Sequence, residues 1–209
     1  METKSIIMIA IVIILGIILY FGMNYLKARQ QNKMVELLQN GEFDQFFALT
    51  DSLLTKYLFP RYNVEYLKLN GYIIKGEEAN IEKQFDFLLN ARKNKAQTED
   101  ITMKAFNYYV GIENKEKSTE LLEQIQSFTN ERMVKEAETM YDIFILKNGN
   151  HIEELLTTLE KLPEEGKAVN EYLLSVQYEN IGDKENAKKY EKLSKKHMES
   201  TAKQKKNKS

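Results

Sequence analysis

The chain has 209 residues, with 30 Lys and Arg against 31 Asp and Glu. Because a nucleic-acid-binding domain usually carries a broad basic excess, this near balance disfavours RNA or DNA as a partner. There is no Cys, and His151 and His197 are the two histidines, which excludes disulfides and cysteine nucleophiles and argues against a metal site. We therefore expect no cofactor and no metal.

The first element is an apolar segment at residues 6–25, which predicts a transmembrane helix. Only three of its residues lie outside the apolar and aromatic set, and none is charged. About 20 residues at about 1.5 Å each span about 30 Å, the thickness of the hydrocarbon core of a bilayer. A signal peptide would have a shorter apolar core and a small-residue cleavage site. After a short flank at residues 1–5, the segment predicts an uncleaved single-pass anchor in the lipid bilayer.

The basic residues on the two sides of this segment bear on orientation. Lys4 precedes the segment, whereas Lys27, Arg29 and Lys33 follow it. Basic residues favour the cytoplasmic side of a membrane, so the excess leans towards a cytoplasmic body. The difference is small, and the side is left open. The predicted location is the cell membrane.

The body at residues 26–197 is predicted to be helical. Its apolar residues recur at spacings of three and four rather than two, as in Leu53, Leu54, Tyr57 and Leu58. No Gly or Pro lies between Met23 and Asn40, so the first helix of the body is expected to continue from the apolar segment without a break.

Five turn residues divide the body at a regular interval. They are Gly41, Gly76, Asn114, Gly149 and Gly182, separated by 35, 38, 35 and 33 residues. Asn is the expected substitute for Gly, because both tolerate the left-handed backbone conformation that ends many helices. A helix-turn-helix unit of this length that cannot bury its own apolar face must stack on its neighbours. The expected fold is an all-α solenoid of about five helix-turn-helix repeats.

The last repeat carries the most specific sequence pattern. Gly182 is followed after five residues by the small Ala187 and after three more by the aromatic Tyr190. In this pattern, and in its period, the chain resembles the tetratricopeptide repeat (TPR) family. The resemblance covers residues 26–197 and implies stacked helix pairs that bind proteins or peptides.

Two repeats depart from the family pattern. Thr119 and Glu154 stand where the family has a small residue, which suggests a shifted or shortened second helix in those repeats. The contacts between helices use Leu, Ile, Phe and Tyr rather than the family's Ala, which implies wider helix spacing. An irregular helical bundle is the alternative fold.

The resemblance implies a concave binding surface lined by the first helix of each repeat. Counted back from the turns, its groove positions are Asn63, Tyr66, Asn70, Ile73, Lys104, Tyr108, Val169, Tyr172 and Val176. Asn amides can hydrogen-bond the backbone of an extended peptide, and Tyr combines a large contact area with a polar tip. The alternative role of each Tyr is packing between helices. Lys104 and Asn70 match only fragments of the family's clamp for a C-terminal carboxylate, so we do not predict that clamp.

The tail at residues 198–209 is basic and is expected to be disordered. Contact with anionic lipid is its functional interpretation, and a solvated, solubilising tail is the alternative. Its lysines lack the interleaved aromatic residues that favour nucleic-acid stacking.

No enzyme motif occurs in the sequence: there is no phosphate-binding Gly loop, no dinucleotide motif, no nucleophile elbow and no HExxH. Acidic pairs such as Glu153 with Glu154 lie near predicted helix starts, where they complement the helix dipole. His151 and His197 are expected to be surface or capping residues. We expect the protein not to be an enzyme.

The function expected from these features is that of a membrane-anchored TPR-like adaptor or scaffold. It would bind a protein or peptide partner and hold it at the membrane, where local concentration favours encounters. One alternative is a chaperone or assembly factor for membrane or exported proteins. The other is a structural subunit of a larger membrane complex, whose apolar helix packs against other membrane helices.

Overall fold

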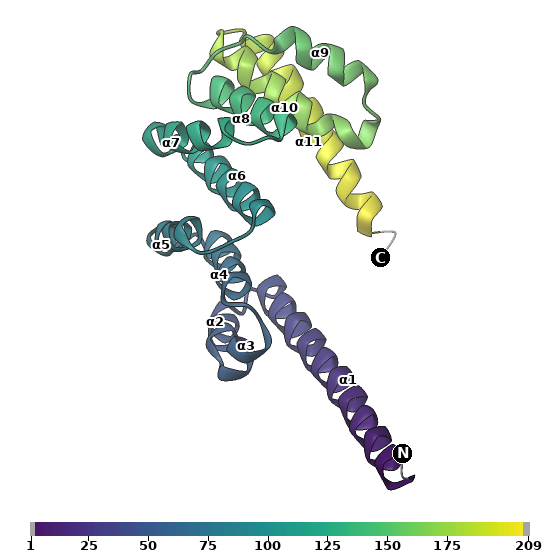
Figure 1. Cartoon of the computed structure of the whole chain (residues 1–209). Coiled ribbons are helices and arrows are strands. Elements are labelled where there is room, and N and C mark those ends of the chain that lie inside the picture. Colours follow the sequence, from purple (N-terminus) through teal and green to yellow (C-terminus); the bar gives the residue numbers. More distant parts are fainter. Residues whose placement is uncertain (1–2, 207–209) are drawn as a thin grey trace. The chain divides into compact units, whose positions relative to one another are not determined.

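The computed structural model describes the backbone of residues 3–206 and the side chains of residues 13–202. Within these residues there are eleven α-helices and no strand (Figure 1). The predicted all-α class is confirmed, and the helix order is consistent with an α-solenoid. The structure differs from the expected single body, because the chain forms two compact units, Met1–Asn94 and Lys95–Ser209.

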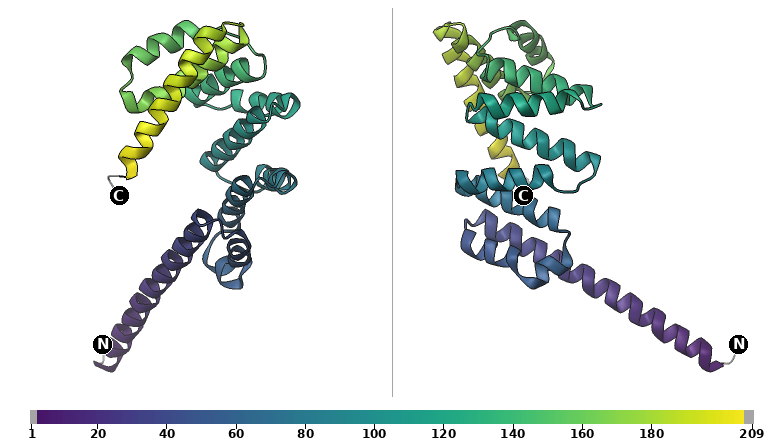
Figure 2. Two further views of the ribbon diagram at one scale, coloured as in Figure 1. Left: turned by 180° about the vertical axis from the view of Figure 1, so that it is seen from behind. Right: turned by 60° about the vertical axis from the view of Figure 1, so that its left-hand side comes forward.

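The first unit contains five helices: α1 (Thr3–Gln39), α2 (Phe43–Asp51), α3 (Leu53–Leu58), α4 (Arg61–Lys75) and α5 (Glu78–Asn90). Helix α1 contacts α2 and α3, α2 contacts α4, and α4 pairs with α5. The three views agree that α2 and α3 lie beside the C-terminal half of α1 (Figures 1 and 2).

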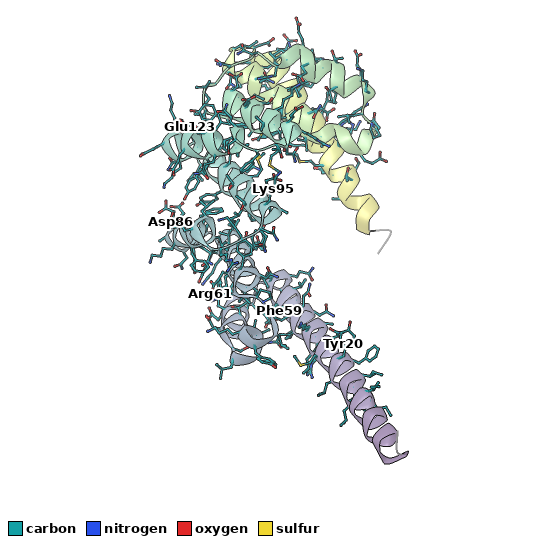
Figure 3. The ribbon with its side chains drawn as sticks, viewed as in Figure 1. Tyr20, Phe59, Arg61, Asp86, Lys95 and Glu123 are labelled. Atoms are coloured by element: carbon teal, nitrogen blue, oxygen red, sulfur yellow. The ribbon has the colours of Figure 1, made fainter. Side chains whose placement is uncertain are left out.

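The core of the first unit joins α1 to α2. Met34 and Leu37 of α1 and Phe46 of α2 are buried together, with Phe59 packed against them beside α1 (Figure 3). Gly71 allows α4 to approach this core closely, because a Cβ at this position would lie 2.7 Å from Cε1 of Phe46. The missing side chain of Gly71 therefore sets the spacing between α2 and α4.

Helix α1 is one unbroken helix, as the absence of Gly and Pro between Met23 and Asn40 predicts. Its large apolar side chains from Ile13 to Tyr25 are exposed, and Tyr20 projects away from the helix (Figure 3). Within the part of the chain that the structure describes, no helix combines the length and the apolar composition of a membrane span. The predicted transmembrane helix at residues 6–25 begins before Ile13, so its first side chains lie outside the described residues.

The segment from Leu53 to Leu58 forms α3, but the helix does not bury all the residues that the apolar spacing predicts. Ser52 ends α2 and caps α3, because its hydroxyl accepts a hydrogen bond from the Thr55 amide. This break in the helix turns Thr55 and Leu58 inward and leaves Leu53 exposed.

The second unit contains six helices within the described residues: α6 (Lys95–Gly111), α7 (Lys115–Gln126), α8 (Glu131–Phe144), α9 (Ile152–Lys161), α10 (Glu164–Asn180) and α11 (Lys184–Lys206). Helix α6 pairs with α7, and α10 pairs with α11 along much of its length. Helix α8 contacts α6, α7 and α10. Leu155, Leu174 and Tyr190 form the buried cluster at the C-terminal end of this unit.

All five predicted turn residues lie between consecutive helices. Gly41, Gly76 and Gly182 have φ values of 72°, 74° and 79°, in the left-handed region where a side chain is disfavoured. These three turns follow the expected mechanism.

The other two turns use a different mechanism from the one predicted. Glu113 and Lys147 take the left-handed conformation, with φ of 55° and 57°. Asn114 instead begins α7 as its N-cap, and its side chain accepts a hydrogen bond from the Lys117 amide. Gly149 is needed for space, because a Cβ there would collide with the side chain of Ile181.

The fourth repeat departs most from a regular helix pair. Helix α9 has 10 residues and packs mainly on α10 rather than on α8. The sequence predicts a shifted or shortened second helix both for this repeat and for the third. In the third repeat, by contrast, α7 packs on α6. The 12-residue length of α7 is similar to the 13-residue length of α5.

The C-terminal segment also differs from the prediction. Residues 198–209 were expected to be disordered, yet α11 remains helical to Lys206, and residues 207–209 lie outside the described residues. Once α10 has packed against α11, each further residue adds a helical hydrogen bond at low cost, and Lys, Gln, Glu and Ala are good helix formers. Contact of this segment with anionic lipid stays a prediction.

Candidate partner-binding surfaces

In the first unit, two of the predicted groove residues lie beside a cavity between α1 and α4. Asn63 and Tyr66 of α4 line this cavity of about 220 Å³. Its other lining residues are Gln31, Met34, Val35, Phe59, Val64 and Leu67. The lining combines apolar side chains with the amides of Gln31 and Asn63 and the hydroxyl of Tyr66, which suits an apolar side chain on a polar peptide backbone.

Asn70 and Ile73 continue along α4 from these two residues. The positions Asn63, Tyr66, Asn70 and Ile73 are three or four residues apart and therefore follow one side of the helix. Asn63 is exposed, and the other three are partly buried. The Tyr66 ring also lies 6.2 Å from that of Tyr62. We name these four residues the α4 surface.

An ion pair on another side of α4 fixes the helix to α2. The Lys68 amine donates a 2.8 Å hydrogen bond to Asp51 and lies 3.6 Å from Glu65. The hydrogen bond from Lys68 lowers the pKa of Asp51. Burial alone would lower the pKa of Lys68, but the bond to Asp51 and the charge of Glu65 outweigh it and raise that pKa. Lys68 stays charged, and α4 is held in a defined orientation.

Helix α5 is tied to the same group of charges. The Gln84 amide donates hydrogen bonds of 3.0 and 3.1 Å to the side chain and the backbone carbonyl of Glu65. The guanidinium of Arg61 lies 4.7 Å above the ring of Phe87, which joins the start of α4 to α5. The α4 surface is therefore carried by a helix that is fixed from two sides.

In the second unit, the predicted groove residues lie on α6 and α10. Lys104 and Tyr108 of α6 are partly buried. On α10, Val169 is 61% exposed, Tyr172 is 46% exposed and Val176 is partly buried. None of the nine predicted groove residues is fully buried, but they belong to two units and are treated as two separate surfaces.

Tyr172 packs between helices and also leaves surface exposed for a partner, which are the two roles that the sequence left open. Its ring lies 6.2 Å from the ring of Phe144 of α8 with an angle of 28° between the planes, so it packs between α8 and α10. Almost half of its side-chain surface remains accessible to a partner. The accessible part of this second surface is therefore centred on Val169 and Tyr172.

The prediction for His197 was wrong, because this residue is buried against α10. Its Nδ1 lies 2.7 Å from Glu171 and its Nε2 lies 2.8 Å from Glu164. The Glu171 side chain is only 3% exposed. The sequence does contain a signal for this burial, because Glu171 lies three residues from both Ala168 and Leu174, which are the buried apolar residues of α10. The histidine and the two carboxylates hold α11 on α10.

His151 has the capping position that the sequence predicts. It is the N-cap of α9, and its amide donates a 2.8 Å hydrogen bond to the side chain of the buried Gln177. Its ring lies 3.2 Å from Asp142. The acidic pair of Glu153 and Glu154 lies in the first turn of α9, as expected. These groups join the start of α9 to α8 and α10.

Within the described residues, no group of three or more His, Asp or Glu side chains is arranged to hold a metal ion. Comparison with known protein families, with curated proteins and with solved structures finds no match to this chain.

Proposed function

We propose that the protein is a single-pass membrane adaptor with a TPR-like helical body. Residues 6–25 hold it in the bilayer, and the helix pairs bind a protein or peptide partner. The adaptor works by concentration, because a partner held at the membrane meets membrane components more often than one in solution.

The composition and exposure of α1 support the anchor. Residues 6–25 carry no charge, and most of the described side chains from Ile13 to Tyr25 are large, apolar and exposed. An apolar surface of this length is unfavourable in water and favourable in a bilayer.

The order of helix contacts supports a repeat of the TPR type. First helices of successive pairs are neighbours in the second unit, where α8 contacts both α6 and α10. Second helices contact the first helix of the next pair, as α7 does with α8 and α9 with α10. This alternation is what a stack of helix-turn-helix units produces.

One observation carries the proposal: α1 belongs to both the anchor and the candidate binding cavity. Val35 of α1 lines the cavity beside the α4 surface, and it lies ten residues beyond Tyr25 in the same unbroken helix. Ten residues of helix correspond to about 15 Å. A partner in the cavity would be held about 15 Å from the end of the membrane segment, with no flexible tether.

Photo-crosslinking in cells that express the full chain tests this proposal. A benzoylphenylalanine replaces Tyr66 on the α4 surface, and the same residue replaces the exposed Glu82 of α5 as the matched control. We expect a discrete product from position 66 in the membrane fraction that position 82 does not give. The product should persist when residues 6–25 are replaced by an unrelated apolar helix.

The other results would favour the rival functions. Loss of the product after replacement of residues 6–25 would indicate a subunit whose membrane helix makes specific contacts. A broad smear of products from position 66 would indicate a chaperone with little sequence selectivity. Identical products from positions 66 and 82 would contradict a role for the α4 surface.

A further inference from the structure

The short helix α3 exposes three large apolar side chains on one face. Leu53, Leu54 and Tyr57 are 88%, 45% and 77% exposed. Tyr57 lies four residues after Leu53 and three after Leu54, and residues at these spacings are neighbours on a helix surface, so Tyr57 joins the three side chains into one patch. Large apolar side chains gathered in this way mark a surface for a partner or a membrane.

The opposite side of α3 is fixed to the rest of the first unit. The Thr55 hydroxyl donates a 2.7 Å hydrogen bond to the carbonyl of Leu49 and accepts one of 2.8 Å from the Gln30 amide of α1. Leu58, one turn later, is buried. The apolar patch therefore has a defined direction relative to α1.

Helix α3 lies beside the part of α1 that directly follows the predicted membrane segment. Leu54 lines a cavity whose other lining residues belong to α1 between Tyr25 and Glu36, and Thr55 is bonded to Gln30 in the same stretch. Five residues of helix from Tyr25 to Gln30 correspond to about 7.5 Å. The polar layer on each side of a bilayer is about 5 to 8 Å thick, so α3 lies at the level of this layer.

The charges around the patch fit an anionic surface. Two acidic residues lie in this region: Glu36, which is 3.3 Å from Lys33, and Asp51, which is 3.3 Å from Lys56. The exposed surface of α1 and α3 carries more basic than acidic residues. The basic residues are Lys27, Arg29, Lys33 and Lys56. Positive charge beside an apolar patch is the combination that binds anionic lipid headgroups.

We propose that α3 is a second membrane contact, in which Leu53, Leu54 and Tyr57 enter the headgroup layer of an anionic bilayer where α1 leaves it. The inference rests on the proposed function, because it requires residues 6–25 to lie in that bilayer. A second contact beside α1 prevents the first unit from rotating about the axis of α1. It thereby fixes the direction in which the α4 surface faces.

The test uses the full chain in vesicles of equal parts phosphatidylcholine and phosphatidylglycerol. Because the chain has no Cys, an environment-sensitive fluorophore can be attached to Leu53→Cys, Leu19→Cys or Asp44→Cys. Position 19 reports the anchor, and position 44 is an exposed control at the start of α2. A lipid with a spin label near its headgroup quenches fluorophores in the headgroup layer.

We expect quenching at position 53 to be several-fold stronger than at position 44, with quenching at position 19 as well. Quenching at position 53 should fall several-fold in uncharged phosphatidylcholine, and equal quenching would overturn the role of charge. Quenching at 19 with none at 53 would overturn the inference and leave the anchor standing. A blue-shifted but unquenched signal at 53 would mean that protein covers α3. Absence of quenching at both positions would reject the anchor too.

Discussion

The spacing between α2 and α4 depends on a single missing side chain, and replacing Gly71 with Ala tests it. The added Cβ would lie 2.7 Å from Cε1 of Phe46 and 3.2 Å from Cζ of Phe47. Phe46 is fully buried, so its ring has little room to move. Overpacking of this kind costs about 1 to 3 kcal/mol, whereas Ala improves helix propensity by about 1 kcal/mol. We expect the free energy of opening of α4 to fall by up to about 2 kcal/mol.

Amide hydrogen exchange of the full chain, followed in peptides from α4, measures this change. Gly111→Ala in α6 is the matched control, because nothing lies within 4 Å of its added Cβ, and it should be neutral or stabilising by up to about 1 kcal/mol. In a Phe46→Leu background the cost of Gly71→Ala should largely disappear, because the colliding ring is gone. If Gly71→Ala protects α4 as Gly111→Ala protects α6, the close packing of α2 on α4 is refuted.

Three further predictions concern buried polar groups. The Ser118 hydroxyl is buried without a hydrogen-bond partner, so Ser118→Ala should stabilise α7 by about 1 kcal/mol in hydrogen exchange; a loss of protection would contradict this. His197→Ala leaves the carboxylate of Glu171 buried without its partner and should lower the unfolding free energy of α10 and α11 by about 3 kcal/mol in urea titrations. An unchanged urea midpoint would contradict the role assigned to His197. Lys68→Met removes the partner of Asp51 and should lower the free energy of opening of α4 at neutral pH. Hydrogen exchange of α4 at pH values above and below 3.8, the ordinary pKa of Asp51, measures this change. The folded-state pKa of Asp51 is lowered, so the ion pair stabilises α4 above the ordinary pKa of 3.8. This stabilisation is lost as the pH falls through the lowered pKa of Asp51. If Lys68→Met still destabilises α4 below that lowered pKa, the ion pair is not the source of the stability.

The helix pairs were predictable because their signals are local. Gly at Gly41, Gly76 and Gly182 is required by the left-handed backbone at a helix end, and the interval between turns follows from helix length. The position of Asn114 was predicted for the wrong reason, because a residue that tolerates the left-handed conformation is also a good N-cap. Local sequence does not decide between these roles.

The features that the sequence did not reveal depend on partners distant along the chain. His197 is buried because Glu171, 26 residues earlier, lies opposite it. Leu53 has the spacing of a core residue, but the cap at Ser52 and the bond from Gln30 to Thr55 turn it outward. Both outcomes are set by tertiary contacts, which override local periodicity.

The role of the candidate binding residues stays a prediction, although their positions on α4 follow from the sequence. Asn63 and Tyr66 could be placed by counting from a turn, since a stripe on one helix follows from its period. The cavity beside them could not, because it also needs Val35 from α1. The spacing between two helices is a property of packing and cannot be read from either helix alone.

The most direct test of the account is whether residues 6–25 hold the protein in a membrane. Membranes from cells that express the full chain are washed with alkaline carbonate, which releases peripheral proteins, and the wild type is compared with an Ile13→Lys and Ile17→Lys double variant. Each Lys near the centre of a membrane helix costs about 2.5 to 3.5 kcal/mol. The account predicts that the wild type stays in the membrane pellet and that the double variant is released. Release of the wild type by the wash would contradict the central claim.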